Sequence, residues 1–223
     1  MTTYVLIHGA GDVGWYWHLV EAELRARGHD VVAMDLPCDD EAAGLGDYAQ
    51  TVVDAIGDRT SLVVVAHSFG GYTAPIVCAQ VPVDLLVLVA VMVPKPGESA
   101  EEMFANTGYQ QAEQEDGSDL AVFYHDVPLE LATEALSKGR DQAQKPWQEP
   151  WPLDARPDVP TRYLLCRNDR LFPADWTRRV VRERLGIEPD EIESSHCPAL
   201  SRPVELADCL EGYQAELGKT IGS

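Results

Sequence analysis

A serine in a predicted strand-to-helix turn is the residue of this sequence whose setting most suggests chemistry. Ser68 lies in Ala66-His67-Ser68-Phe69-Gly70-Gly71, after an uncharged, β-branched run at residues 61–65 and before a stretch that favours a helix. Strand, sharp turn and helix form the context of a G-x-S-x-G nucleophile elbow, here with Ala66 in place of the first glycine. A serine before two glycines can equally lie in an ordinary turn or cradle a phosphate. The rest of the chain must decide between these interpretations.

A base and an acid for this serine follow two later predicted strands. A serine hydroxyl becomes a nucleophile when a neighbouring base takes its proton, and that base needs an acid to orient it. His196 lies directly after one strand, and Asp169 lies in the loop after the preceding strand. Taken alone, His196 could be a loop histidine without a task, and Asp169 a capping or turn residue. Because each of the three follows a different strand, all can meet at the carboxyl edge of one parallel sheet. We predict Ser68 as nucleophile, His196 as base and Asp169 as the orienting acid.

The other five histidines fit ordinary structural roles. His8 ends a strand and is expected to shape the turn there. His67 adjoins Ser68, but neighbouring residues of an elbow point apart, which makes it a poor base. The remaining three, for which no partner is suggested by spacing or which fit structure or surface, are His18, His29 and His125.

Acyl transfer at Ser68 would also need donors for the negative charge that develops on the carbonyl oxygen. The Phe69 N–H directly follows the serine, and the Ala10 N–H lies in the loop after the first predicted strand. We predict that these two groups bind the substrate oxygen. The preceding His8-Gly9 also suits a tight turn, and the two interpretations are compatible.

The same loop supports a rival interpretation. Residues 9–14 satisfy G-x-G-x-x-G after a strand and before a helix, and Asp35 ends the next strand, as a Rossmann-type oxidoreductase would require. However, Trp15, Tyr16 and Trp17 crowd the helix start where a pyrophosphate would lie. A nucleotide site also gives no reason for the three sheet-edge residues, so we favour the hydrolytic interpretation.

Composition narrows the classes of function. With 17 Lys and Arg against 37 Asp and Glu, the net charge of −20 argues against nucleic-acid and anionic membrane partners. The five cysteines are odd in number and lack C-x-x-C spacing, so we expect neither a disulfide framework nor a metal site. No signal-peptide pattern and no membrane-length apolar run is present. We expect a cytoplasmic protein that acts on a small molecule without a cofactor; a homodimer stays open.

Strand and helix patterns alternate along most of the chain, which predicts an α/β fold with a mostly parallel sheet and helices on both faces. The expected strands are 3–7, 30–36, 61–66, a strand within 83–93, 161–166 and a short one within 187–193. The expected helices are 15–27, 47–56, one behind Ser68, 129–138, 174–185 (its arginines mostly outward) and 205–217. The pattern weakens between 95 and 156. We therefore predict a core of residues 1–94 and 157–223 and a short helical lid insertion at 95–156.

The motifs together resemble the α/β-hydrolase superfamily. Within it, the chain is similar to the plant-type group of methyl-salicylate esterases and hydroxynitrile lyases, in a compact bacterial-looking form. The motifs that carry this resemblance are Leu6-Ile7-His8-Gly9-Ala10, Trp15-Tyr16-Trp17, Met34-Asp35-Leu36-Pro37, Ala66-His67-Ser68-Phe69-Gly70-Gly71, Asn168-Asp169-Arg170 and residues 196–203. The resemblance implies the hydrolase fold and the Ser68, Asp169, His196 order of catalytic residues.

The resemblance leaves two activities to separate. The lyases of that group carry a threonine where this chain has Gly9, and a lysine where it has Cys197. We therefore expect a carboxylic ester hydrolase for a small neutral ester or lactone rather than a lyase. A binding protein with an idle triad is a third interpretation, and nothing in the motifs looks damaged. Trp147 and Trp151 of the insertion are expected either to line the pocket or to pack the insertion on the core.

Overall fold

A six-stranded parallel sheet forms the centre of the molecule. The computed structural model describes residues 1–110 and 117–221. The strand order is β2-β1-β3-β4-β5-β6, and every neighbouring pair is parallel. The strands are β1 (Thr3–Ile7), β2 (Asp30–Ala33), β3 (Leu62–His67), β4 (Leu85–Val89), β5 (Thr161–Cys166) and β6 (Asp190–Ile192). The predicted parallel α/β architecture is thus confirmed.

The central strands are apolar because both of their faces are covered. All residues of β1, β3 and β4 are buried, whereas the edge strand β6 is short and partly exposed. In the register of the sheet, Val64 of β3 lies beside Val5 of β1 and Leu86 of β4. Burial of each such side chain contributes about 1.5–3 kcal/mol to folding. A charged side chain in one of these central strands would be buried between the sheet and a layer of helices.

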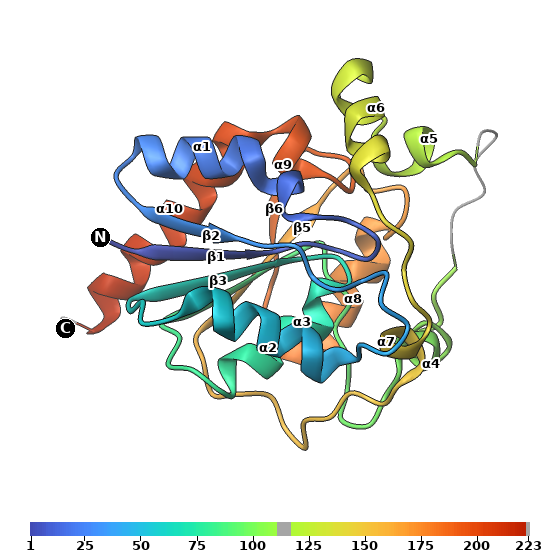
Figure 1. The fold of residues 1–223 in the computed structure, drawn as a ribbon, viewed down its shortest axis with the longest axis horizontal. Helices are drawn as coiled ribbons and strands as arrows, with labels where there is room; N and C mark the ends of the chain where they lie inside the picture. Colours follow the sequence, from blue (N-terminus) through green and yellow to red (C-terminus); the bar gives the residue numbers. More distant parts are fainter. Residues whose placement is uncertain (111–116, 222–223) are drawn as a thin grey trace.

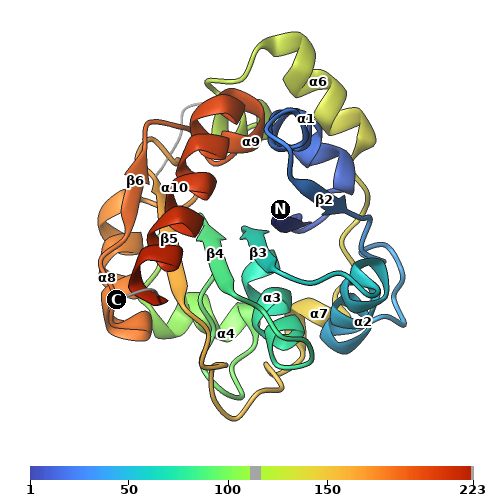
Figure 2. The ribbon, with the colours of Figure 1, turned by 90° about the vertical axis from the view of Figure 1, so that its left-hand side faces the viewer.

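Helices cover both faces of the sheet (Figures 1 and 2). On one face lie α1 (His18–Ala26), α9 (Pro198–Ser201) and α10 (Pro203–Ile221), with the 3-10 helix η1 (Gly14–Trp17) before α1. The other face carries α2 (Leu45–Ile56), α3 (Gly70–Cys78) and α8 (Ala174–Leu185). Within the described ranges, no helix is long and apolar enough to cross a membrane.

The segment between β4 and β5 holds the predicted insertion. It contains α4 (Ala100–Asn106), α5 (Asp119–Phe123), α6 (Leu129–Lys138) and α7 (Lys145–Gln148). Of these, α6 has the predicted bounds, and the other three are too short to show a periodic pattern in sequence. Residues 111–116, part of the predicted insertion, lie outside the described residues. Figure 1 shows these helices at the end of the molecule toward which the parallel strands run. The role of this segment as a lid stays a prediction.

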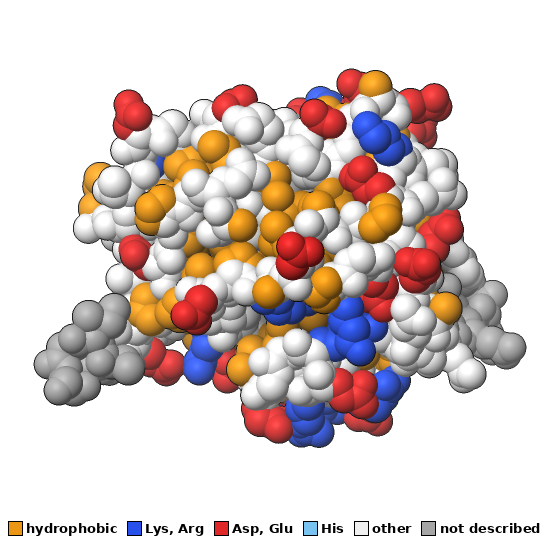
Figure 3. Space-filling view, turned by 90° about the horizontal axis from the view of Figure 1, so that it is seen from below, with side chains coloured by type: hydrophobic (Ala, Val, Ile, Leu, Met, Phe, Trp, Pro, Cys, Tyr) orange, Lys and Arg blue, Asp and Glu red, His pale blue; other side chains and the backbone are white. Residues whose placement is uncertain are grey.

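One sequence expectation was wrong in its bounds, and the expectation that the α8 arginines point mostly outward holds with one exception. The second strand ends at Ala33 rather than Leu36, because the Leu36 N–H donates to the His8 ring at 2.9 Å instead of to a neighbouring strand. Arg184 does not point outward: its side chain is 3% exposed and pairs with Glu98, whose side chain is 6% exposed. The remaining arginines of α8 bind surface acids, and Figure 3 shows Lys and Arg side chains gathered among Asp and Glu on one face.

Candidate active site

Ser68 lies in the turn between β3 and α3 with a backbone φ of +53°. L-residues rarely adopt this left-handed conformation, and strain of this kind persists only where the surroundings hold the chain. Here the Ser68 N–H donates to the Val89 carbonyl at 3.3 Å, and the Ser68 carbonyl accepts from the Met92 N–H at 3.1 Å. The end of β4 therefore holds the turn on both sides, and the hydroxyl is presented at the sheet edge.

Glycines are required around this turn because other backbone segments approach closely. A Cβ at Gly71 would lie 2.1 Å from the Met92 carbonyl oxygen, and one at Gly70 would lie 3.0 Å from the His8 carbonyl oxygen. On the opposite side, a Cβ at Gly9 would lie 2.9 Å from the Ser68 Cβ. By contrast, Ala66 lies within β3 and is fully buried, so the variant first position of the motif is accommodated.

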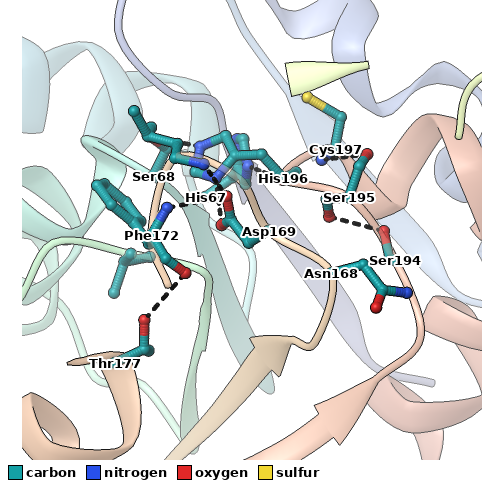
Figure 4. Close-up of polar contacts among 12 residues, drawn as sticks. His67, Ser68, Asn168, Asp169, Phe172, Thr177, Ser194, Ser195, His196 and Cys197 are labelled. Carbon is teal, nitrogen blue, oxygen red and sulfur yellow. Dashed lines mark hydrogen bonds and ion pairs between the residues drawn. The ribbon is translucent and has the colours of Figure 1, made fainter. Parts of the chain in front are cut away.

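His196 links Ser68 to Asp169 (Figure 4). Its Nε2 is 3.0 Å from the Ser68 Oγ, and its Nδ1 is 2.7 Å from the Asp169 Oδ2. The side chains of His196 and Asp169 are 3% and 2% exposed. Because the Asp169 carboxylate accepts from Nδ1–H, the Nε2 lone pair is available to the Ser68 hydroxyl. The structure therefore brings together the three residues that the sequence singled out, in the order that proton transfer from serine needs.

Asp169 is fixed by backbone donors as well as by the imidazole. Its Oδ1 accepts from the N–H groups of Leu171 and Phe172 at 2.8 and 2.9 Å, and its Oδ2 faces His196. The rings of Phe172 and Phe123 meet the His196 ring edge-on, at centroid distances of 5.1 and 5.6 Å. These contacts limit rotation of the imidazole and shield it from water.

Two histidines that seemed ordinary in sequence contact the site. The Nε2–H of His67 donates to the His196 carbonyl at 2.8 Å, and its ring stacks on Tyr16. Burial holds the pKa of His67 well below its usual value, so this ring is neutral beside His196. His125 of the insertion donates from Nε2 to the Asn168 carbonyl at 2.9 Å. No spacing signal could have found these contacts, because each joins segments far apart in sequence.

The other three histidines make structural contacts. His8 shapes its turn as expected: Nδ1 donates to the Gly9 carbonyl, and burial lowers its pKa to about 4. His18 binds the Trp15 carbonyl, and His29 binds Glu211 on α10.

A pocket of about 850 Å³ opens above Ser68 and His196. This volume falls in the range of small-molecule sites. Aromatic and aliphatic side chains form one part of the lining: Met92, Phe104, Tyr109, Phe123, Trp147, Leu171 and Phe172. Acidic side chains form another part: Asp12, Asp39, Asp119 and Asp141. The pocket arginine, Arg140, is held by Asp35 at 2.6 Å.

The two tryptophans of the insertion differ in position. Trp147 lines the pocket and packs against Phe69 at a centroid distance of 4.8 Å. Trp151 is buried in the core, where its Nε1–H donates to the Tyr72 carbonyl at 3.0 Å. One of the two thus has the pocket position that the sequence left open, and the other packs the insertion on the core.

The predicted oxyanion donors belong to the two segments that meet at Ser68. Ala10 lines the pocket, and Phe69 directly follows Ser68 and begins the turn into α3. In the part of the chain that the structure describes, neither N–H makes a hydrogen bond to another protein group. Their use as oxyanion donors stays a prediction.

The G-x-G-x-x-G segment forms a packed turn that does not favour the nucleotide interpretation. The Gly14 N–H donates to Asp35 Oδ1 at 2.9 Å, and Arg140 takes the other oxygen of this carboxylate. Tyr16 and Trp17 fill the start of the helix and are 1% and 0% exposed. Asp35, which would have held a ribose, is thus engaged within the protein.

Asp12 is the pocket carboxyl with the strongest electrostatic perturbation. It lies in the loop after β1, and its Oδ1 accepts from the Val13 N–H at 2.9 Å. Burial raises its pKa to about 7, against the opposing effects of this hydrogen bond and of nearby His196. Asp12 therefore changes charge near neutral pH inside the pocket.

Asp12→Asn is expected to stabilise the fold more at high pH than at low pH. The folded chain holds the Asp12 proton with a pKa of about 7 against an ordinary 3.8, so stability falls as pH rises through this interval. At 1.4 kcal/mol for each pKa unit, and with partial solvation, the gain at pH 8.5 is about 1–3 kcal/mol. Urea unfolding of both chains measures it, and at pH 5 less than half of the gain should remain. An equal gain at both pH values would contradict the raised pKa.

Within the described ranges, no group of three or more His, Cys, Asp or Glu side chains could hold a metal ion.

Known proteins that are similar to this chain agree with its fold. A model of the alpha/beta hydrolase family matches residues 4–209. Methylesterase 7 of Arabidopsis thaliana is 27% identical over 246 residues, which cover 93% of this chain and 94% of that protein. Norfluorocurarine synthase 1 of Strychnos nux-vomica is 24% identical over 257 residues, 93% of each chain. The crystal structure of polyneuridine aldehyde esterase is similar in fold, with a TM-score of 0.80, 20% identity and coverage of 96% of this chain and 99% of that one.

Proposed function

The chain belongs to the alpha/beta hydrolase family, and from this premise we propose that it is a serine hydrolase of small neutral carboxylic esters or lactones. The observation that carries the proposal is the position of His196, within hydrogen-bond distance of both Ser68 Oγ and Asp169. Relatives named as methylesterases and as a methyl jasmonate esterase support ester hydrolysis as the reaction.

The proposed reaction runs through an acyl-enzyme. His196 Nε2 takes the Ser68 proton as Ser68 Oγ attacks the ester carbonyl, and Asp169 stabilises the imidazolium that forms. His196 then gives the proton to the departing alcohol. A water molecule activated by His196 attacks the acyl group, releases the carboxylic acid and returns the proton to Ser68.

The Ala10 and Phe69 N–H groups would bind the oxyanion of each tetrahedral intermediate. Their contribution is large because the donors are fixed before the charge develops, and loss of one such donor typically lowers the rate about 10²–10³-fold. Gly9 allows the loop that carries Ala10 to approach Ser68 closely, since a Cβ at Gly9 would lie 2.9 Å from the Ser68 Cβ.

Hydroxynitrile lysis is not favoured. In the group that the sequence resembles, that activity uses a threonine at the position of Gly9 and a lysine at that of Cys197. A Cβ at residue 9 would lie 2.9 Å from Ser68 Cβ, and Cys197 is 3% exposed and uncharged, with its pKa raised by burial.

The charges of the pocket support a neutral substrate. Four carboxyl groups line it, and its arginine is already paired with Asp35. An anionic ester would therefore approach like charge, and Arg140 is not free to receive it. The aromatic part of the lining, which includes Phe104 and Trp147, suits an apolar acyl or alcohol group.

A panel of matched aryl esters tests the substrate class. 4-Nitrophenyl pentanoate and 4-nitrophenyl hemisuccinate are similar in size, and the second carries a carboxylate. We expect kcat/KM for the neutral ester to be higher by about 10-fold or more, because a like charge a few ångströms away raises the free energy of the bound ester by about 1–4 kcal/mol. A palmitate ester should be hydrolysed more slowly than the pentanoate. Preference for the anionic or long-chain ester would contradict this substrate class.

A further inference from the structure

We propose that His125 and Asp126 of the insertion form a brace that positions the loops of Asp169 and His196 for reaction. The brace joins two loops that leave different strands, β5 and β6, to a segment that also lines the substrate pocket. The proposal rests on the proposed function, because it assigns a positioning role for that chemistry to two residues that do not touch the reacting atoms.

Each brace residue contacts the residue directly before a member of the candidate triad. The His125 ring donates to the Asn168 carbonyl at 2.9 Å, next to Asp169. The Asp126 Oδ2 accepts from the Ser195 N–H at 2.9 Å, next to His196. Two consecutive side chains thus hold the backbone of both loops at the positions from which the acid and the base project.

The two loops are joined directly to each other at the edge of the sheet. Among the described residues, the three-residue strand β6 is the last strand on this side. The Asn168 N–H donates to the Ser194 carbonyl at 3.0 Å, and the Asn168 side-chain amide donates to Glu193 at 3.2 Å. Figure 4 shows Asn168 and Ser194 on these adjoining loops, with the side chains of Asp169 and His196 together. The brace adds a further connection, which comes from the insertion rather than from the sheet.

One carboxylate oxygen of Asp126, Oδ1, is buried without a hydrogen-bond partner among the described residues. An unsatisfied buried oxygen of this kind destabilises a fold by about 1–3 kcal/mol.

The residues just before the brace face the substrate. Phe123 and Tyr124 line the pocket, and the Phe123 ring meets the His196 ring at 5.6 Å. The same segment is fastened to the acid loop by Arg170, whose guanidinium donates to the Ala121 carbonyl at 2.8 Å. Residues 123 and 124 therefore line the substrate pocket, and residues 125 and 126 contact the loops of Asp169 and His196.

Loss of the brace should slow the reaction more than it weakens binding. A displacement of a catalytic group by about 1 Å can lower a rate about 10²-fold. We expect Asp126→Ala to lower kcat for 4-nitrophenyl pentanoate about 10–100-fold, with KM within about 3-fold of the wild-type value. Asp126→Asn should restore most of kcat, because its amide oxygen can still accept from the Ser195 N–H. Glu130→Ala, which removes an exposed carboxylate of α6, is the matched control and should leave both constants unchanged.

His125→Ala gives an independent test. Thermal unfolding shows whether each variant is folded. If Asp126→Ala does not fold, the kinetics of His125→Ala test the proposal. This substitution removes the contact with Asn168 and should lower kcat about 3–10-fold at unchanged KM, a smaller loss because the Asp126 contact remains.

The outcomes separate the brace from the function on which it rests. A wild-type chain that hydrolyses the ester through Ser68, together with wild-type kcat in Asp126→Ala and in His125→Ala, would overturn the brace alone. A kcat loss in Asp126→Ala that Asp126→Asn does not restore would also overturn it. A wild-type chain without Ser68-dependent hydrolysis would overturn the proposed function and the brace with it.

Discussion

Replacing Ser68 with alanine is expected to lower kcat/KM for 4-nitrophenyl pentanoate by about 10⁴-fold or more while leaving the fold intact. The substitution removes the proposed nucleophile, Ser68 Oγ, but keeps the Cβ, so the strained φ of +53° and the packing against Gly9 do not change. Initial rates of wild type and variant, measured side by side, give the loss directly. Thermal unfolding should show similar midpoints for the two chains.

Ser61→Ala is a matched control for this experiment. Ser61 lies just before the same strand, at its opposite end, and also has a left-handed backbone with φ of +56°. It is exposed, far along β3 from the site. The control should keep wild-type rates. Equal rates in wild type and Ser68→Ala would instead show that any hydrolysis arises elsewhere, and the elbow would lose its role.

Asp169→Asn is expected to lower kcat about 10⁴-fold through the tautomer of His196 rather than through its position. Two backbone N–H groups, of Leu171 and Phe172, point at Oδ1 and will hold the amide oxygen of asparagine there. The amide NH₂ then faces His196 Nδ1 and donates to it. The imidazole proton must move to Nε2, which can no longer accept the Ser68 proton.

The control for this effect is Asp175→Asn at the start of α8. The Asp175 side chain is 98% exposed and pairs with Arg178 at the surface, where such a pair contributes little. Steady-state kinetics of the two variants should therefore differ by several orders of magnitude. A loss of less than about 10-fold in Asp169→Asn would mean that Asp169 caps its loop and does not orient the base.

The sequence was sufficient for the architecture because the strands and helices carry strong local patterns. The uncharged run of β3, the amphipathic pattern of α8 and the isolated helix α6 all lie where their residues predict them. The candidate site could also be predicted from the sequence, because parallel strands bring the residues that follow them to one edge of the sheet. Family membership and the parallel fold are confirmed, whereas the roles of Ser68, Asp169 and His196 remain predictions that the variants test.

Features that depend on contacts between distant segments could not be predicted. Arg184 has the helical position of a surface residue, and only the approach of Glu98 from the insertion buries it. The contacts of His67 with the His196 carbonyl and of Asp126 with the Ser195 N–H have the same origin. Short helices such as α4 and α7 give no periodic signal because their one or two turns are fixed by packing.

The most direct test of the account is to locate a covalent adduct on the chain. A fluorophosphonate reacts with an activated serine, displaces fluoride and leaves a stable phosphonyl ester in the position of the acyl group. Intact mass and peptide mapping of the wild-type chain should show one phosphonyl group, on Ser68, and hydrolysis of 4-nitrophenyl pentanoate should fall in parallel. Ser68→Ala should stay unlabelled. Full inactivation with the label on another residue, or an active chain that takes no label, would contradict Ser68 as the nucleophile.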